Sequence, residues 1–370
     1  MTRYQSTFPG ADNSCRTANA VSISVIRRCL LLCALSTVCL PCTYASSRLS
    51  TDVIHMKNGD VMTCEIRSLS QGQLTIKQGY ANSTVSLDWN EVDHLVTQQP
   101  FAIIGSDGKS YSGAMSESAE DRILRITGID NAAIPHAEVV SIQQTGTTFV
   151  RKLRGSFDLG LSFTKSNAQS NLTLNTDLNY QGEKHMGAFS SSTQFSTQQK
   201  TTNTSETTVK SGFFRELGRP NWYGGGIANL LSSSEQEIDV RTTFGAVLAM
   251  RPIFTNKTNL TLFGGLAYTL EKDAENAQAT ASKHSLDAAA AVEFSTFRFD
   301  STTFDTTVWV YPSLTSAGRV RMTLNQDVYF KFLKDFYLRA SFYDNYDNQP
   351  VVNAPPNNFG VTTTVGWSFR

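Results

Sequence analysis

The chain has 370 residues, of which 17% are charged, and its 32 Lys and Arg balance its 32 Asp and Glu. A formal net charge of zero offers no basic surface for nucleic acid, so no nucleic-acid partner is expected. The longest apolar run, residues 29–41, is too short to cross a bilayer as a helix, which needs about 20 apolar residues. If this chain spans a membrane, it must do so as a closed β-barrel.

Residues 1–45 are predicted to hold an export signal behind an N-terminal extension. Arg27 and Arg28 precede the apolar run, and the tripeptide 43–45 places small residues where a signal peptidase reads the chain. The mature protein is expected to begin near Ser46. Translation from a non-Met codon within the polar extension is an open alternative.

Five of the six cysteines lie in or before this signal, which leaves Cys64 alone in the mature chain. No intramolecular disulfide can then form. Export without disulfides fits a protein that is stabilised by a closed ladder of hydrogen bonds between strands.

Residues 51–143 contain a duplication. An Asn-Gly turn at 58–59 in the first copy is matched by an Asp-Gly turn at 107–108 in the second, and both dipeptides tolerate the positive φ of a tight hairpin. Each copy reads as strand, turn, two further strands and a closing strand. The sequence therefore predicts two small SH3-like repeats in tandem, at residues 46–98 and 99–143.

A linker at residues 144–154 precedes about twelve alternating segments, and residues 155–370 are predicted to form an antiparallel barrel. Each segment is expected to supply the roughly 9 to 11 residues that a tilted strand needs to cross the hydrocarbon layer. The final strand shows the pattern best, with one apolar face for lipid and one small or polar face for water. Its apolar positions are Phe359, Val361, Thr363, Val365, Trp367 and Phe369.

The expected connections alternate in length. Those at 182–184, 217–220, 256–258 and 333–334 are tight, those at 271–283 and 345–358 are long, and 232–238 is intermediate. Aromatic residues crowd the tight ones, as in the girdle of a membrane barrel. Bacterial barrels have short periplasmic turns and longer extracellular loops, so the duplicated domain is expected in the periplasm. A soluble all-β protein, whose strands would also alternate, is the alternative.

The segments 337–350 and 359–369 carry a resemblance to a known family. A Tyr- and Asn-rich loop with Pro350 leads into a Gly-x-x-x-x-x-Gly-aromatic strand. In this hairpin, and more weakly over the carboxyl-terminal two-thirds, the chain resembles a family called salt-induced outer membrane proteins. The resemblance implies an outer-membrane barrel in a diderm bacterium, and the family has no established activity. Such barrels generally end on the aromatic residue itself, whereas here Arg370 follows Phe369.

No catalytic residues are expected. His284 and Ser285 with Asp287 resemble part of a lipase site, but adjacent residues on a strand point to opposite faces and cannot reach each other. No nucleophile with a base and an orienting third group is visible.

No metal or cofactor is expected either. The histidines of the duplicated domain, His55, His94 and His136, lack a second ligand at the spacing of a metal site.

Charged residues on the polar faces of the strands are candidates for the barrel lumen. They are Asp287, Glu293, Asp305, Arg319, Arg321, Asp327, Lys331 and Arg339. They could line a pore that selects solutes by charge, or pair across the lumen and fill it. The sequence leaves both open.

The fold class that these patterns predict is all-β, an outer-membrane barrel of about twelve strands behind a small periplasmic tandem repeat. The leading hypothesis for function is a non-enzymatic envelope protein, with a narrow passive pore as its concrete form. The alternative is a structural anchor whose repeats bind peptidoglycan or a periplasmic protein. Further expected partners are outer-membrane lipid and the barrel assembly machinery, which would read Val365, Trp367 and Phe369.

Overall fold

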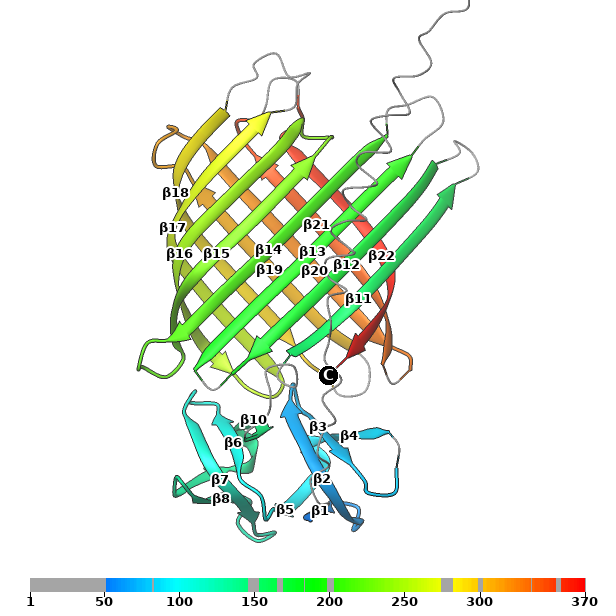
Figure 1. The fold of residues 1–370 in the computed structure, drawn as a ribbon, viewed down its shortest axis with the longest axis vertical. Coiled ribbons are helices and arrows are strands. Elements are labelled where there is room, and N and C mark those ends of the chain that lie inside the picture. The colour runs from blue at the N-terminus through cyan, green and yellow to red at the C-terminus, as the bar shows by residue number, and fades with distance from the viewer. Residues whose placement is uncertain are drawn as a thin grey trace, which may run out of the picture. The chain divides into compact units, whose positions relative to one another are not determined.

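The computed structural model describes residues 51–81, 83–145, 153–164, 169–182, 184–197, 203–273, 282–298, 302–333, 335–350 and 354–369. Their regular structure consists of strands and two short 3-10 helices. The strands form two groups, a sheet and a closed barrel (Figure 1). The predicted export signal and most of the predicted linker lie outside the described residues.

The sheet contains two copies of one strand pattern. The first copy is β1 (Asp52–Met56), β2 (Val61–Ser70), β3 (Gln73–Lys77), β4 (Thr84–Asp88), η2 (Trp89–Glu91) and β5 (Val92–Val96). The second is β6 (Phe101–Gly105), β7 (Ser110–Glu117), β8 (Ile123–Gly128), β9 (Ala132–Pro135), η3 (His136–Glu138) and β10 (Val139–Gln144). In both copies the first strand pairs with the second and the last. Gly59 and Gly108 take positive φ at equivalent turns, as their dipeptides predict.

The two copies do not form separate barrels, which corrects the prediction of two SH3-like repeats in tandem. The last strand of each copy pairs with the second strand of the other, β5 with β7 and β10 with β2. With the pairing of β1 and β2, these contacts close a ring in the order β1-β5-β7-β6-β10-β2. A unit of about 45 residues buries little apolar surface alone, so a shared ring gives both copies one larger core.

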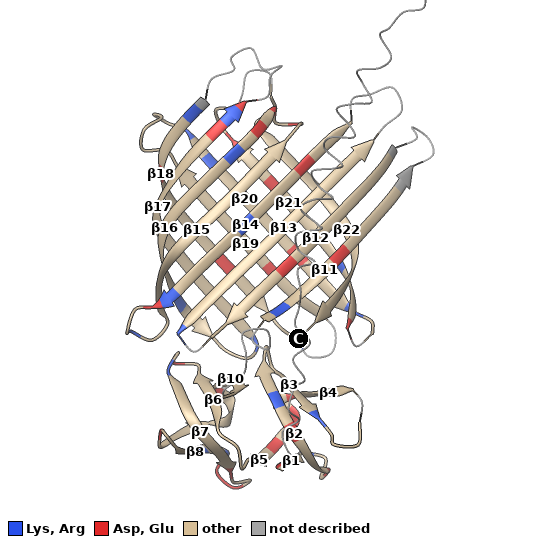
Figure 2. Ribbon diagram, viewed as in Figure 1, with Lys and Arg blue, Asp and Glu red and all other residues tan. Residues whose placement is uncertain are grey.

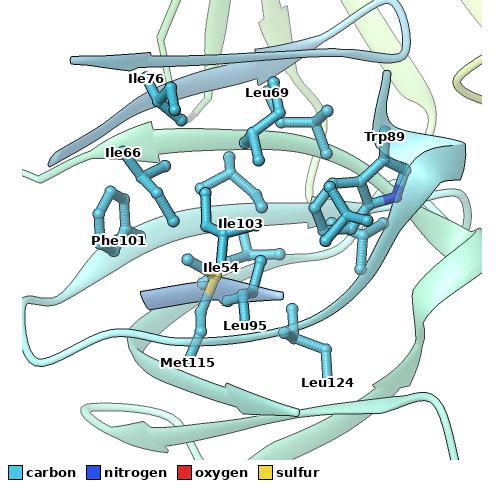
Figure 3. Packing of buried hydrophobic residues seen from close by; sticks show 14 of the residues in the cluster. Ile54, Ile66, Leu69, Ile76, Trp89, Leu95, Phe101, Ile103, Met115 and Leu124 are labelled. Atoms are coloured by element: carbon cyan, nitrogen blue, oxygen red, sulfur yellow. The ribbon is translucent and has the colours of Figure 1, made fainter. Parts of the chain in front are cut away.

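Both copies contribute to that core (Figure 3). Ile54, Leu69 and Trp89 of the first copy lie in one cluster with Ile103 and Met115 of the second, and each is at most 1% exposed. Burying a side chain of this size contributes about 1.5–3 kcal/mol. A cut between the copies would therefore expose the core of each.

Among the described residues, twelve antiparallel strands form the closed barrel, which confirms the predicted all-β class and the barrel of about twelve strands. They are β11 (Leu153–Thr164), β12 (Gln169–Gln181), β13 (His185–Thr197), β14 (Thr204–Glu216), β15 (Trp222–Ser233), β16 (Ile238–Phe254), β17 (Thr258–Asp273), β18 (Ser282–Thr296), β19 (Thr302–Pro312), β20 (Val320–Lys331), β21 (Phe336–Asp347) and β22 (Asn357–Phe369). They are 11 to 17 residues long, and all except β19 are longer than the roughly 9 to 11 expected. The ladder of β16 and β17 shows why, because it continues into polar residues as far as Asp273.

The barrel closes between its first and last strands, and this closure is short. Five residue pairs join Gly155–Leu159 to Val365–Phe369, whereas twelve join β11 to β12. The rings of Phe157 and Phe369 stack there, with centroids 5.8 Å apart.

Successive connections alternate between the two ends of the barrel. One end, here the short-turn end, carries residues 182–184, 217–221, 255–257, 297–301 and 332–335. The other, the long-loop end, carries 165–168, 198–203, 234–237, 274–281, 313–319 and 348–356. The connections expected to be tight all lie at the short-turn end, together with the carboxyl terminus (Figure 1).

The outer surface of the barrel is apolar. On β22, Phe359 is 66% and Val361 73% exposed, whereas the intervening face holds the buried Asn358 and Thr364. Charged residues also occur along the barrel strands (Figure 2). Many of their side chains are buried, which places them in the lumen.

Candidate functional site

The lumen is the candidate site, and one of its walls is aromatic. Phe214, Tyr223, Phe263, Trp309 and Tyr311 are buried in one cluster that spans β14 to β19. The rings of Phe263 and Trp309 lie 5.2 Å apart and those of Trp309 and Tyr311 5.8 Å apart. Small residues of β16 to β18, among them Ala249, Ala267 and Ala289, are buried in the same cluster.

A cluster of two arginines and two carboxylates lies at the long-loop end. Arg319 reaches Asp347 at 2.6 Å and Glu271 at 3.1 Å, and Arg241 reaches the same two carboxylates at 3.0 and 2.6 Å. The four side chains are at most 11% exposed. Their charges balance, so removal of one leaves a buried unpaired charge, which costs about 3–5 kcal/mol.

A second cluster, around Arg321, lies next to the first and farther from the long-loop end. Its guanidinium donates to Thr269 at 2.7 Å and pairs with Asp287, which also accepts a hydrogen bond from Ser285 at 3.1 Å. The same guanidinium lies 5.5 Å from the ring centroid of Tyr311, so the cluster contacts the aromatic wall.

The third cluster is centred on Arg339, nearer the short-turn end. Arg339 contacts Asp158 at 2.7 Å and both Asp177 and Asp327 at 2.9 Å. Tyr337 donates a hydrogen bond to Asp158, so β11, β12, β20 and β21 are tied together by this group. One guanidinium thus contacts three carboxylates here.

Further side-chain hydrogen bonds cross the lumen. Glu206 on β14 accepts from Asn345 on β21 at 3.1 Å and from Asn358 on β22. Gln236, in the connection between β15 and β16, donates to the carbonyl oxygen of Asn345 at 3.3 Å. These strands lie on opposite sides of the ring, so the long-loop half of the lumen is spanned by side chains.

The structure brings together five of the charged residues singled out from the sequence. Arg321 pairs with Asp287, Arg339 with Asp327, and Arg319 joins residues outside the predicted set. The other three share the inward faces of their strands: Glu293 alternates with the exposed Val292, Asp305 is in register with Asp327, and Lys331 lies two positions beyond Tyr329.

Sequence reasoning missed several lumen residues, namely Asp158, Asp177, Glu206, Arg241, Glu271 and Asp347. The signal was present for Asp158, which stands between the apolar Phe157 and Leu159. A lone carboxylate between two lipid-facing residues points into a lumen, where it needs a partner.

The residues of the lipase-like motif separate on β18. Ser285 is buried in the lumen against Asp287, whereas His284 is exposed on the opposite face. In the duplicated domain, the rings of His55 and His94 stack with centroids 4.0 Å apart. Within the described ranges, no group of three His, Cys, Asp or Glu side chains is placed to hold a metal ion. No helix in the described part of the chain is long and apolar enough to span a membrane.

Comparison with known proteins finds one matching family and several solved structures with a similar fold. The translocator domain of the autotransporter NalP from Neisseria meningitidis is 16% identical, covering 61% of this chain and 90% of that one, with a TM-score of 0.33. The NanC porin is 13% identical, covering 59% and 98%, with a TM-score of 0.36. No curated protein matches the sequence significantly. Residues 157–369 match the family described as "Protein of unknown function, DUF481", and the chain belongs to that family.

Proposed function

We propose that the protein is a non-enzymatic outer-membrane protein whose barrel is a sealed anchor and whose duplicated domain stands in the periplasm. The observation that carries this proposal is the set of hydrogen bonds and ion pairs that cross the lumen. A sealed barrel cannot pass solutes, so its contribution is to hold the attached domain at the membrane.

Membrane insertion is supported by the outer face of the barrel. Leu266, near the middle of β17, is 52% exposed, and Leu248 on the neighbouring β16 is 53% exposed. A soluble protein with such a continuous apolar surface would aggregate. The even strand count puts both chain ends of the barrel at the same end. In this proposal the longer loops are extracellular, as in bacterial barrels, and the end with the chain termini is periplasmic.

The seal is supported by the burial of the lumen charges. Asp287 is fully buried and Arg319 is 7% exposed, although both are charged groups that water would solvate in an open channel. Burial of such ions is tolerated only where each is paired and hydrogen-bonded. Each charged side chain of the three clusters has at least one ion-pair partner.

Conductance in planar bilayers tests the seal. We expect no steady current through the refolded wild-type protein. The double variant Arg241→Ala with Arg319→Ala removes both cations of the long-loop cluster, and we expect it to produce discrete channels. Lys272→Ala is the matched control, because Lys272 lies at the same end in an exposed ion pair with Asp239. A steady wild-type current would rule out the sealed anchor.

A narrow passive pore is the second candidate. It is favoured because the contacts that cross the lumen are made by side chains, and a change of rotamer could break them and open a passage. In that case the wild-type protein would conduct, and neutralising Arg339, with its three carboxylates, would raise its preference for cations.

For the anchored domain, we propose peptidoglycan or a periplasmic protein as partner. Co-sedimentation of residues 46–150 with purified peptidoglycan tests the first. Absence from the pellet, with capture of a periplasmic protein on the immobilised domain, would favour the second.

A further inference from the structure

The barrel wall is only partly closed along one seam, between its first strand β11 and its last strand β22 (Figure 1). Within the described residues, the two strands pair at Gly155–Leu159 on β11 and Val365–Phe369 on β22, next to the short-turn end. They are still close one step further, because a Cβ atom on Gly160 would lie 2.8 Å from the carbonyl oxygen of Thr363. The long-loop half of the seam lies beyond that point.

In this half, residues 161–164 of β11 and 357–362 of β22 each have one free strand edge. On their other edges both segments are paired, β11 with β12 as far as Thr164 and β22 with β21 as far as Asn357. Among the residues described, neither free edge has a ladder partner. Two rows of backbone N–H and C=O groups therefore face the opening.

The side chains on the outer face show the same opening. Phe157 and Leu159 are each 49% exposed where the strands pair, whereas Leu161 is 75% exposed. On β22, exposure rises in the same way, from 50% at Val365 to 73% at Val361. On the other barrel strands, the described large apolar side chains are at most 57% exposed. The side chains beside the opening are apolar, so the free edges lie at the level of the hydrocarbon in the proposed membrane orientation.

Free strand edges at this level need a polypeptide partner. Lipid contains no water that could bond backbone N–H and C=O groups, so an exposed sheet edge is not stable there. An acyl chain offers neither donors nor acceptors, whereas another strand offers both. A single strand inserted into the seam would be antiparallel to one edge and parallel to the other, because β11 and β22 run in opposite directions.

A second molecule of the same protein avoids this mismatch. When two barrels face each other across their seams in one membrane, β11 of each molecule meets β22 of the other, and both new ladders are antiparallel. We propose that the protein pairs with a second molecule through this seam, which covers all four free edges. The proposal rests on membrane insertion but not on the sealed lumen, so a conducting barrel would leave it intact.

Cross-linking in bacterial outer membranes tests the pairing. Ser162→Cys and Thr362→Cys are placed on separate full-length chains that are co-expressed, and a short bismaleimide is added before extraction. Both positions lie in the open half of the seam and carry small side chains. We expect a covalent dimer that contains one chain of each variant. Leu266→Cys is the matched control, because Leu266 is exposed on β17, across the ring from the seam, and like the wild type it should give no dimer above background.

The double variant Ser162→Cys with Thr362→Cys distinguishes pairing from closure of the seam on itself. We expect it to form covalent dimers as well. Links found only within one chain, by mass spectrometry of the cross-linked peptides, would overturn the proposal. So would the absence of dimer from the co-expressed variants, an equal yield from Leu266→Cys, or a link to a different protein.

The wild-type protein provides a measurement that no substitution can disturb. In maltoside detergent, sedimentation equilibrium should give the mass of two chains, and the mass of one chain would overturn the proposal. Anomalous migration of unheated gel samples checks that each cysteine variant has folded as a barrel.

Discussion

Trp89 and His136 stack face to face, with ring centroids 4.0 Å apart and planes 3° from parallel. Each donates a ring N–H to the carbonyl oxygen of the other at 3.1 Å. They begin the 3-10 helices η2 and η3, which hold equivalent places in the two copies. The stack therefore lies where the two copies meet, and the second ring nitrogen of His136 contacts the buried carboxylate of Glu117 at 2.9 Å.

Breaking this buried pair should destabilise the duplicated domain. Glu117→Leu leaves His136 without its partner in a dry environment, which costs about 3–5 kcal/mol. Adding His136→Phe removes the orphaned group, so the double variant should recover much of that loss. Urea unfolding of residues 46–150 measures both, with Glu138→Gln at an exposed position as control. A double variant less stable than Glu117→Leu would show that the lost contact between His136 and Glu117 is not the cause.

The fragment 46–150 should itself unfold in one cooperative transition, because its ring of strands closes and its core contains both copies. Circular dichroism and tryptophan fluorescence should report the same midpoint. Two separate transitions would mean that the copies fold independently.

The thiol of Cys64 should be inert in the native protein. Burial, with the charges of Asp52 and Glu65 beside it, raises the pKa of this thiol from 9.0 to about 12. The thiolate is the reactive form, so at pH 8 only about one thiol in ten thousand would be ionised. A disulfide reagent should react slowly at pH 8 and quickly after denaturation in guanidinium chloride. Stoichiometric labelling of the native protein would contradict this environment.

Arginine on the outer face should impair insertion according to depth. Leu266→Arg lies near the middle of β17 and should cost about 2–4 kcal/mol, whereas Leu270→Arg, nearer the long-loop end, should cost about 0–1 kcal/mol. Both leucines are about half exposed, at 52% and 46%, so they differ mainly in depth. Urea unfolding in lipid vesicles measures the difference. Equal costs would mean that the bilayer is not centred on Leu266.

The proposed orientation can be tested on intact cells. Ala317→Cys lies in an exposed connection at the long-loop end and should react with an impermeant thiol reagent. Lys257→Cys, exposed at the short-turn end, should react only after the outer membrane is opened. The reverse pattern would place the duplicated domain outside the cell.

The alternation along β20 and β22 predicted which faces would meet lipid, and the exposed Phe330, Val361 and Trp367 agree with it. It could not predict the lumen partners. Arg241 and Asp347 are 106 positions apart, and their contact depends on strand tilt and on the height of each residue along the axis. Alternation fixes a face but neither of these quantities.

The shared ring escaped sequence reasoning for a related reason. Pairing inside one copy is the same whether the copies stand apart or interlock, so the turns at Gly59 and Gly108 fit both arrangements. The two arrangements differ at the free edges of β2 and β7. In the structure, each of these edges pairs with the last strand of the other copy.

The contact between the copies is the same contact made twice, since β5 meets β7 as β10 meets β2. A contact of this kind is isologous, the type found in dimers with twofold symmetry. The duplicated domain thus has the architecture of a homodimer whose two subunits are joined in one polypeptide. A shorter chain with one copy would have to recruit a second molecule to cover its strand edges, whereas covalent linkage fixes the ratio at one pair per barrel.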